Sequence, residues 1–589
     1  MRPSARIWGL IPALACLLLC QCGKTPVTPG PEPSGETGLE AQLVPQQILR
    51  NVTVTTDKAV YAPGSVVQFT GDRSQSGLGV RYWHLGDVVE EQLLDDSAAW
   101  TWTLPATDFQ GYYVEIIGKN AQGVVRTVGS VAVDASSDWT RFPRYGFLSK
   151  FGGVAPSKIA SVIANLNRYH INGIQYYDWM YDHHHPLAGT PEKPDSDWPS
   201  IIGDICEKDV VQGYIDEAHR YNMASMFYDL CYGVLAWAEE DGVSPSWNLY
   251  TDAGARNRDY HPLSAPFRSN IYLVNPGNAG WLDYFSAQVD DVYQVFAFDG
   301  FHIDQLGSRG TRYDAAGQQV DIPSGYGKFL EKMKQAQPSK KLAFNAVSRY
   351  GQAKIAAAPS DFLYNEVWTV GFSEIDKIMR ENVLLAPEKN TVLAAYMNYK
   401  QSGYFNTPAV LLADAVIFAL GGSHLELGEH MLSNEYFPSA GLKMTAELSE
   451  KLVAYYDFLT GYENLLRDGA QRYNLNVSSD QVSMDAWGPV KGSVNTAAFQ
   501  VGDKLVVHLL NFEKAKHLDW RDDSMNQAVP SVHENLTVSI RSSRDVRKIW
   551  VASPDVDGGV PREAVWSANG IKIDITVPYL NYWTMIVIE

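Results

Sequence analysis

From about residue 141 onward the sequence alternates between short strand-like runs and amphipathic helical runs, and this alternation constrains the fold more than any other feature. In the first helical run, Ile159, Val162, Ile163 and Leu166 follow the i, i+3, i+4, i+7 spacing of one helix face. Strands that alternate with helices are typical of a parallel sheet. Eight such units over about 310 residues predict a (β/α)8 TIM barrel with insertions. The expected strands are 145–148, 173–177, 224–228, 298–303, 342–345, 362–365, 392–396 and 424–427, and further helical stripes lie at 210–221, 281–296, 326–333, 375–379 and 410–420.

The regions on either side of this segment have a different pattern. A chain of 589 residues is too long for one hydrophobic core, so several domains are expected. Residues 47–136 contain short β-rich runs about 10 residues apart with turn residues between them, which predicts an immunoglobulin-like β-sandwich. We interpret it as a spacer, with sugar binding as the alternative. The barrel then occupies 137–465, with 231–275 as a loop over its active face, and 466–589 is predicted to be a C-terminal antiparallel β-sandwich.

The N-terminus has the composition of an export signal. Arg2 and Arg6 precede a mostly apolar stretch at 7–19, which is too short to span a membrane. Residues 1–22 are therefore predicted to be a signal peptide of the lipoprotein type. We expect an exported protein that a lipid anchor holds at the cell surface or in the periplasm, with simple secretion as the alternative.

The cysteines are few, and two of them support this interpretation. Cys20 and Cys22 follow the apolar stretch in a loose match to a lipobox, and one of them is the expected acylation site. Residues 23–46 are rich in Pro and Gly and poor in apolar residues, which predicts a linker. Cys206 and Cys231 do not make a disulfide framework in a chain of this size, and they could either pair or remain buried thiols.

Composition limits the class of partner. The formal net charge is −19, and phosphate backbones repel so acidic a chain, which argues against nucleic acid. A neutral polymer is unaffected by this charge. The 16 Trp and 32 Tyr residues belong in part to protein cores, but flat aromatic faces also stack on sugar rings. We expect a monomer that binds a glycan and uses no cofactor.

Carboxylates and aromatic residues follow the predicted strands at their carboxyl ends, where the active site of such a barrel lies. Asp304 ends the fourth strand and Glu366 ends the sixth. Glycoside hydrolysis needs two carboxyl groups, one to protonate the leaving oxygen and one to attack or to activate water. Burial beside Tyr364 and Trp368 predicts a raised pKa for Glu366, which suits a general acid. An isolated Asp would more often cap a loop or form an ion pair, but the position of Asp304 favours catalysis.

Other polar and aromatic residues at the strand ends are candidates for sugar contacts. Three adjacent histidines, 183–185, cannot all face one metal ion from regular structure, and no carboxylate pair at ligand spacing accompanies them, so we predict no metal site. A sugar contact by one of them and plain loop structure both remain open. Asp229, Asn275, Asn345 and Glu426 could equally be structural, and Asn275 begins a turn-like run. The predicted sugar-binding residues are Tyr177, Asp178, Trp179, His183, His184, Asp229, Asn275, His302, Gln305, Asn345, Trp368 and Glu426.

Four motifs in chain order carry a resemblance to a known family. They are QYYDWMYDHH from residue 175, DGFHID from residue 299, YNEVW from residue 364, and HLELGEH with NEYFP from residue 424. Together they resemble glycoside hydrolase family 66, which contains dextranases and cycloisomaltooligosaccharide glucanotransferases. The resemblance implies that Asp304 is the nucleophile and Glu366 the general acid/base. His302 stands where a more polar residue would be expected.

The resemblance implies an endo-acting, retaining hydrolase that cleaves the α-1,6 linkages of dextran to linear isomalto-oligosaccharides. In the cyclising members that the barrel resembles, a carbohydrate-binding module is inserted within the barrel. Here the connection from 396–398 to 407 is too short to hold a folded module. A cyclising glucanotransferase, another α-glucan hydrolase and an inactive surface glycan-binding protein are the alternatives. The presence of both carboxylates argues against the inactive protein, and the strand-4 signature that we associate with amylases is absent.

Overall fold

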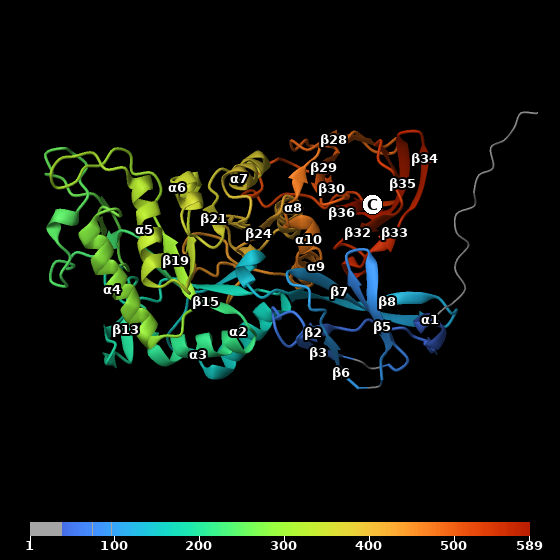
Figure 1. Ribbon diagram of the computed structural model, residues 1–589, viewed down its shortest axis with the longest axis horizontal. Helices are drawn as coiled ribbons and strands as arrows, with labels where there is room; N and C mark the ends of the chain where they lie inside the picture. The colour runs from blue at the N-terminus through green and yellow to red at the C-terminus, as the bar shows by residue number, and fades with distance from the viewer. Residues whose placement is uncertain (1–37, 73–74, 96) are drawn as a thin grey trace, which may run out of the picture. The chain divides into compact units, whose positions relative to one another are not determined.

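The computed structural model describes residues 38–72, 75–95 and 97–589 (Figure 1). The predicted signal peptide, with Cys20 and Cys22, and the first part of the predicted linker lie outside these residues. Gly38–Glu589 form one compact unit, in which strands predominate and most helices lie between residues 156 and 466. Within the described chain, no helix combines the length and the apolar character that a membrane span needs.

The first part of the unit consists of two sheets that share one core. In the larger sheet the strand order is β1-β7-β4-β5, and β8 pairs with β7; the smaller sheet has the order β2-β3-β6. Alternate residues of β3 are buried, as expected for a strand with one face toward a core. Tyr82 of the larger sheet stacks on Trp102 of the smaller one, with ring centroids 4.3 Å apart. The bounds are β1 Pro45–Gln46, β2 Val54–Thr56, β3 Val66–Gly71, β4 Gly79–His84, β5 Asp87–Leu93, β6 Ala99–Thr103, β7 Gln110–Asn120 and β8 Val125–Ala135.

The end of the predicted linker is folded. Helix α1 covers Leu39–Gln42, and β1 pairs in parallel with β7. Leu39 and Leu43 are buried and pack with Ile117. The linker prediction for 23–46 is therefore wrong over its last residues, because Leu39 and Leu43 have an apolar partner in β7.

Eight parallel strands follow, and each lies next to its successor in the chain. Five form one sheet and three form another. Two single parallel bridges join the sheets, Asn345 with Tyr364 and Phe147 with Gly428, so that the segment after the last strand is linked to the first strand. Each strand predicted in this region overlaps one of the eight and is confirmed. Their bounds are β9 Tyr145–Leu148, β10 Gly173–Tyr176, β15 Ala224–Leu230, β19 Gly300–Asp304, β20 Lys341–Phe344, β21 Leu363–Glu366, β22 Thr391–Ala394 and β24 Gly422–His424.

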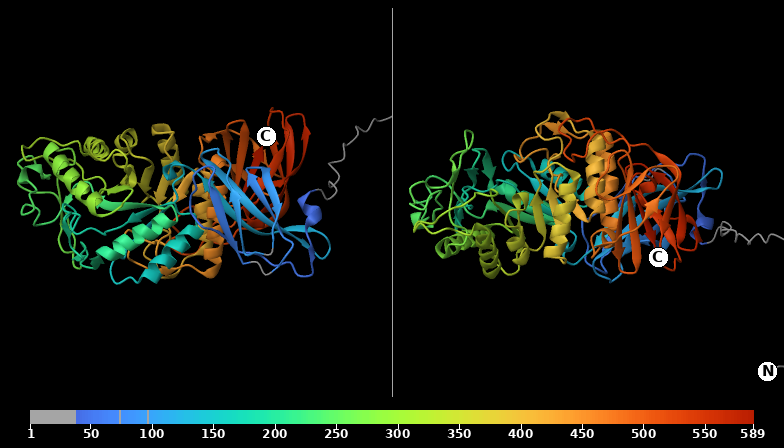
Figure 2. Two further views of the ribbon diagram at one scale, coloured as in Figure 1. Left: turned by 60° about the horizontal axis from the view of Figure 1, so that its bottom comes forward. Right: turned by 90° about the horizontal axis from the view of Figure 1, so that it is seen from above.

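Helices connect these strands and lie on their outer side (Figures 1 and 2). The six predicted helical stripes are confirmed, and their apolar faces are buried, as Ile159, Val162, Ile163 and Leu166 show for α2. Helix α6 was not predicted, because its six residues are too few for a clear stripe. The bounds are α2 Pro156–Arg168, α3 Lys208–Arg220, α4 Ala279–Val295, α5 Ile322–Ala336, α6 Gln352–Ala357, α7 Phe372–Leu385 and α8 Thr407–Ala419.

Two connections contain small sheets of their own. Between β10 and α3 lie the hairpins β11 (Gly189–Thr190) with β12 (Lys193–Pro194), and β13 (Asp197–Pro199) with β14 (Ile205–Glu207). The 231–275 segment forms a three-stranded sheet of β16 (Gly233–Val234), β18 (Ile271–Leu273) and β17 (Tyr260–His261). Cys206 and Cys231 are both free and buried, which resolves the choice between a disulfide and two thiols.

The chain ends in two further sheets around one core, reached through the helices α9 (Ala446–Gly461) and α10 (Glu463–Leu466). The larger sheet has the order β26-β29-β30-β36-β32-β33 with β28 beside β29, and the smaller one has the order β27-β31-β35-β34. The short strands β23 (Gly403–Tyr404) and β25 (Leu442–Lys443) pair ahead of this region. The bounds are β26 Gln471–Arg472, β27 Val477–Ser478, β28 Met484–Ala486, β29 Val494–Val501, β30 Lys504–Asn511, β31 His533–Arg541, β32 Ile549–Ala552, β33 Arg562–Glu563, β34 Val565–Asn569, β35 Lys572–Leu580 and β36 Trp583–Ile588.

Candidate active site

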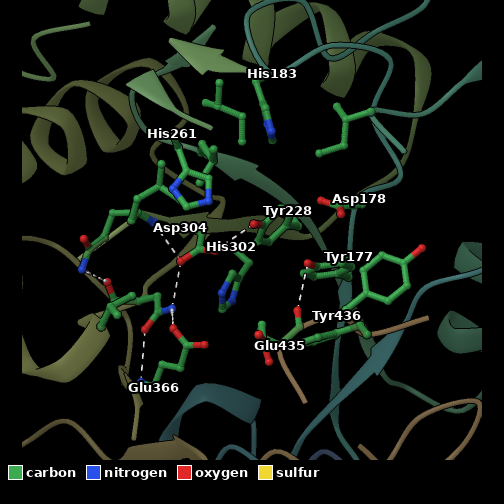
Figure 3. A pocket seen from close by; sticks show the side chains of 18 of the residues that line it. Tyr177, Asp178, His183, Tyr228, His261, His302, Asp304, Glu366, Glu435 and Tyr436 are labelled. Atoms are coloured by element: carbon green, nitrogen blue, oxygen red, sulfur yellow. Dashed lines mark hydrogen bonds between the residues drawn. The ribbon is translucent and has the colours of Figure 1, made fainter. Parts of the chain in front are cut away.

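A cavity of about 570 Å³ lies at the carboxyl ends of the parallel strands (Figure 3). Asp304 is the last residue of β19 and Glu366 is the last residue of β21, and both line the cavity. Its volume falls within the range of about 300–1,000 Å³ that is usual for ligand sites. Of the predicted sugar-binding residues, the lining includes Tyr177, Asp178, His183, His302, Gln305, Asn345 and Trp368.

Three hydrogen-bond donors hold the carboxylate of Asp304. Its Oδ1 accepts from the backbone N–H of Gln305 and from Asn345 Nδ2, each at 2.8 Å. Its Oδ2 accepts from the hydroxyl of Tyr228, also at 2.8 Å. Burial raises the pKa of Asp304, and the three donors and the nearby His183 oppose that rise. The donors fix the direction of the carboxylate and favour its ionised form, as a nucleophile requires.

Glu366 is in a less polar setting than Asp304. The hydroxyl of Tyr396 donates to its Oε1 at 2.7 Å, and Asn345 Nδ2 lies 3.4 Å from its Oε2. Burial and the negative charge of Asp304 raise the pKa of Glu366 to about 7, against the hydrogen bonds from Tyr396, Trp368 and Asn345. Near neutral pH a large fraction of this carboxyl group is therefore protonated, as a general acid requires.

Asn345, which ends the predicted fifth strand, links the two carboxyl groups. Its Nδ2 lies 2.8 Å from Asp304 Oδ1 and 3.4 Å from Glu366 Oε2, and its Oδ1 accepts from the backbone N–H of Glu366 at 3.2 Å. The two carboxylate oxygens cannot be farther apart than the sum of the first two distances. For this pair of oxygens the upper limit is below the range of about 6.5–9.5 Å that separates the carboxyl groups of inverting glycosidases, which favours retention.

Residues 56–587 match the model of glycosyl hydrolase family 66. The chain belongs to this family. The family predicted from the four motifs is thus confirmed, and the protein is a glycoside hydrolase.

Named relatives of this family 66 chain fall into two groups. It is 26% identical to a cycloisomaltooligosaccharide glucanotransferase of Niallia circulans, in an alignment that covers 97% of this chain and 74% of that protein. It is 24% identical to a dextranase of Streptococcus salivarius, over 82% of this chain and 68% of that protein. Among solved structures, a Paenibacillus sp. cycloisomaltooligosaccharide glucanotransferase in complex with cycloisomaltoheptaose superposes with a TM-score of 0.84 at 24% identity, covering 91% of this chain and all of that chain.

Three polar residues of the cavity wall lie close to the carboxylate pair of this family 66 protein. His302 is buried, which lowers its pKa to about 3, and its ring stacks on Tyr145 and Tyr228. Asp178 has a left-handed backbone with φ of 49°, and burial raises its pKa to about 7. His183 Nδ1 lies 2.7 Å from Asp229 Oδ1, whereas its buried Nε2 has no hydrogen-bond partner among the described residues.

Three of the predicted sugar-binding residues lie outside the cavity lining and have structural partners. Trp179 is fully buried, and it packs among aromatic residues that include Trp198 and Phe298. Asn275 Oδ1 accepts from the backbone N–H of Gly277 in the turn before α4. Glu426 is buried and accepts from the hydroxyl of Tyr456. Trp179 and Glu426 are buried and Asn275 is held in a turn, so we assign these three side chains no ligand contact, and their sugar contacts stay predictions.

Two more predicted contacts, His184 and Asp229, also lie behind the wall. Asp229 supports His183, and His184 Nε2 lies 2.9 Å from Asp241 Oδ2. Asp182 and Asp241 lie within cation-binding distance of His184, which corrects the expectation that no carboxylate pair accompanies the histidine run. Asp182 already accepts hydrogen bonds from Arg268 and Trp237. Because the charge of Arg268 offsets that of the carboxylate, we interpret the group as structural support for the wall.

Several cavity residues were not among the predicted contacts. Tyr228 and Tyr396 donate to the two carboxyl groups, and both stand at the ends of predicted strands, so the signal that selected Asp304 could have found them. Glu435, Tyr436 and Phe437 belong to the NEYFP motif. His261, Leu263, Phe267 and Ile271 come from the long 231–275 segment, where no residue spacing pointed to the cavity.

Proposed function

We propose that this family 66 protein cleaves the α-1,6-glucosidic linkages of dextran internally, by double displacement with retention of configuration. Asp304 is the nucleophile and Glu366 the general acid/base. The proposal rests above all on the position of Asn345, whose amide nitrogen contacts both carboxyl groups and keeps them close together. The substrate class rests on the family and on its named relatives, which comprise a dextranase and cycloisomaltooligosaccharide glucanotransferases.

The different surroundings of the two carboxyl groups support their different roles. In the first step, protonated Glu366 donates its proton to the glycosidic oxygen while ionised Asp304 attacks the anomeric carbon and forms a glycosyl ester. In the second step, the carboxylate of Glu366 removes a proton from water, which attacks the same carbon and releases Asp304. Tyr228 and Asn345 hold Asp304 in its attacking position in both steps.

The pH dependence of kcat/KM is predicted to follow the two pKa values of the free enzyme. Activity is lost as pH rises through about 7, where Glu366 loses its proton, and it is lost at low pH as Asp304 gains one. The Tyr396→Phe variant removes a donor that favours ionised Glu366. Its alkaline limb should therefore move to higher pH.

A pH–rate series for the Tyr396→Phe variant and the native protein measures this shift. The control is Tyr436→Phe, which removes another hydroxyl from the cavity wall, apart from Glu366 (Figure 3). An alkaline limb that stays in place in Tyr396→Phe, or that moves equally in Tyr436→Phe, would contradict the assignment of that limb to Glu366.

The expected products are linear isomalto-oligosaccharides. Residues 395–406 connect β22 to α8, and they leave no room for a folded module that could hold the free end of a glucan. The alignment with the Niallia circulans glucanotransferase extends over 754 positions, more than the 589 residues of this chain, so that relative has segments without a counterpart here. Water should then outcompete an internal hydroxyl group at the glycosyl-enzyme.

Incubation with dextran distinguishes hydrolysis from cyclisation. We expect a rapid fall in viscosity and a series of linear oligosaccharides early in the reaction. The second candidate function is cyclisation, which is favoured by the similarity to the Paenibacillus sp. structure. Cyclic oligosaccharides as main early products would establish that function instead, and glucose as the sole product would contradict internal cleavage.

We also propose that the eight parallel strands form a (β/α)8 barrel over 137–465, with an immunoglobulin-like sandwich at 47–136 and a β-sandwich at 466–589. Strand order and the two joining bridges support the barrel. Export as a lipoprotein anchored at Cys22 or Cys20 is proposed from the sequence alone. Metabolic labelling with a fatty acid tests it, because label that persists after both cysteines are replaced would contradict this anchor.

A further inference from the structure

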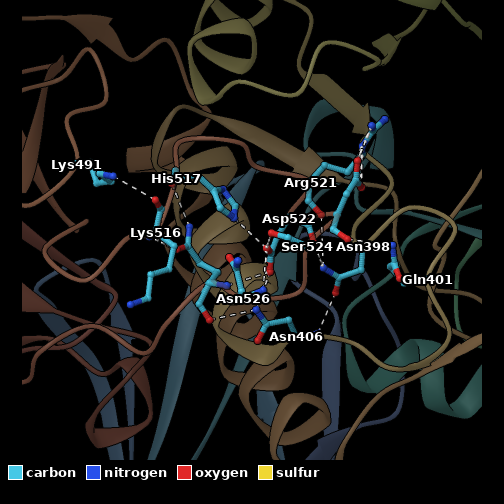
Figure 4. Close-up of polar contacts among 12 residues, drawn as sticks. Asn398, Gln401, Asn406, Lys491, Lys516, His517, Arg521, Asp522, Ser524 and Asn526 are labelled. Atoms are coloured by element: carbon cyan, nitrogen blue, oxygen red, sulfur yellow. Dashed lines mark hydrogen bonds and ion pairs between the residues drawn. The ribbon is translucent and has the colours of Figure 1, made fainter.

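One loop of the C-terminal region reaches the active-site loops. Residues 512–532 connect β30 to β31, and they leave their own sheets to contact the segments that follow β21 and β22. Figure 4 shows the contacts with the second of these segments. These two segments are 367–372 and 397–406, and each follows a strand whose end faces the cavity. The loop is therefore in a position to influence the cavity wall.

The loop is bonded to the first of these segments through its backbone. Trp520 is buried, its backbone N–H donates to the carbonyl of Val370 at 2.7 Å, and its Nε1–H donates to the carbonyl of Thr369 at 2.9 Å. The backbone N–H of Phe372 donates to the carbonyl of Leu518 at 3.0 Å. These contacts fix the residues that directly follow Trp368, which lines the cavity.

The loop holds the second segment through backbone carbonyls and through the side chain of Asp522. The backbone N–H of Asn398 donates to the carbonyl of Arg521, and its Nδ2 donates to the carbonyl of Asp522, both at 2.7 Å. Asn406 Nδ2 donates to Asp522 Oδ2 at 2.6 Å. The two ends of the 397–406 segment are thus tied to one residue of the loop, Asp522.

Asp522 is the centre of this network. It is 1% exposed, and its backbone is left-handed with φ of 46°. Its Oδ1 accepts from His517 Nε2 at 3.0 Å and from the backbone N–H of Asn526 at 3.1 Å. Its Oδ2 accepts from Asn406 and from the backbone N–H of Gln527 at 3.3 Å. Loss of this buried carboxylate would leave several donors without a partner and loosen the end of the 397–406 segment at Asn406.

Tyr399 connects the 397–406 segment to the residues that line the cavity. Its hydroxyl donates to Glu435 Oε1 at 2.8 Å, and its ring packs edge-on against Trp368, with centroids 5.7 Å apart. The guanidinium of Arg521 lies over the same ring, 4.8 Å from its centroid. Glu435 and Trp368 both line the cavity, so the 512–532 loop supports the part of the wall beside Glu366.

We propose that Asp522 is a positioning residue for the side of the cavity that receives the leaving-group sugar. This inference rests on the proposed function, because a general acid faces the oxygen of the leaving group and the residues beside Glu366 would then contact that sugar. Asp522 acts through the 397–406 segment, Tyr399 and Trp368. The C-terminal region thereby takes part in the recognition of the leaving-group sugar, although it supplies no catalytic group.

Two substrates separate this role from a general loss of structure. Dextran has a sugar as its leaving group, whereas isomaltosyl fluoride loses a fluoride ion, which needs neither protonation nor a sugar-binding wall. In Asp522→Ala, kcat/KM for dextran should fall at least ~10-fold, mainly through KM, because small misplacements of a substrate cost that much. The kcat/KM for isomaltosyl fluoride should stay within about 2-fold of that of the native protein, since the two catalytic carboxyl groups keep their hydrogen-bond partners.

The matched control is Asp519→Ala, in the same loop. Asp519 is exposed, and its backbone bridge to Gly371 is retained in the variant. It should behave like the native protein on both substrates. An equal loss on both substrates in Asp522→Ala, or no loss on either, would overturn the proposal. If Asp522→Ala fails to fold, Asn406→Ala removes the same hydrogen bond from the other side.

Hydrogen–deuterium exchange gives a readout that does not depend on any substrate. Faster exchange in 367–372 and 397–406, with unchanged exchange in the parallel strands, is the expected result for Asp522→Ala. Unchanged exchange in both segments would exclude the positioning role. If the native protein leaves dextran intact, the proposed function fails, and the exchange result still decides whether Asp522 positions the wall.

Discussion

The Asp304→Asn variant is expected to lose at least about four orders of magnitude in kcat on dextran while it keeps its fold and its affinity for the glucan. A neutral amide cannot form the glycosyl ester, so the covalent route disappears. The fold should be retained because the amide oxygen can still accept from Gln305 and Asn345. The hydroxyl of Tyr228, which donates to Oδ2 in the native protein, can turn and accept from the new amide nitrogen.

Steady-state kinetics, thermal unfolding and glucan binding together test this expectation. Asp299→Asn is a matched control, because Asp299 directly precedes the same strand and accepts from Ser225 N and His219 Nε2, away from the cavity. It should retain near-native kcat. In Asp304→Asn the pKa of Glu366 should fall, since the charge of Asp304 raises it in the native protein. Near-native turnover by Asp304→Asn would remove this residue from the mechanism.

The Glu366→Gln variant is expected to lose nearly all activity on dextran but to retain activity on a substrate with an activated phenol as leaving group. Dextran needs protonation of the departing oxygen, whereas a good leaving group departs without it. The first step then survives and the second becomes slow. General acid assistance contributes about 10²–10⁴-fold, so the ratio of the two activities should change by a factor in that range.

Azide tests the second half of this role in Glu366→Ala. Azide attacks the glycosyl-enzyme without the help of a base, so it should accelerate the variant and yield an α-glycosyl azide. Glu435→Gln provides the control. Glu435 also lines the cavity, but it accepts a hydrogen bond from Tyr399 and makes none with Asp304 among the described residues. That variant can bind dextran less well, but it should show no azide response. Failure of both the activated substrate and azide to restore any rate would exclude Glu366 as the acid/base.

The parallel strands and the two carboxylates could be predicted because a buried strand has a recognisable pattern of apolar residues in the sequence. A strand covered on both faces is an almost continuous apolar run, and a charged residue that ends such a run must face a cavity or a partner. Asp304 and Glu366 both end strands in this way. The motifs around these two residues are specific enough, taken in chain order, to indicate the family as well.

Side-chain direction beyond the strand ends could not be predicted. Successive residues of a strand point to opposite faces, but that rule stops where the strand stops. β10 ends at Tyr176, and the left-handed backbone of Asp178 turns the chain so that Asp178 lines the cavity while Trp179 is buried. β24 ends at His424, and Glu426 lies beyond it, against Tyr456. Polar residues near strand ends therefore include both ligand contacts and structural ones.

Contacts between distant parts of the chain could not be predicted from the sequence either. The 512–532 loop lies more than a hundred residues from the 397–406 segment that it holds, and no local pattern marks Asp522 as different from Asp523. The burial of Leu39 and Leu43 against Ile117 likewise depends on a strand far along the chain. Local periodicity reports which face of an element is buried, but it does not report what covers that face.

Retention of configuration is the property that follows most closely from two carboxyl groups lying so near each other. Proton NMR of dextran in the first minutes of hydrolysis tests it, because the spectrum records the anomer of each new reducing end before mutarotation. We predict that the α-anomer appears first and that the β-anomer follows at the rate of mutarotation. Initial release of the β-anomer would show inversion and contradict the covalent mechanism at Asp304.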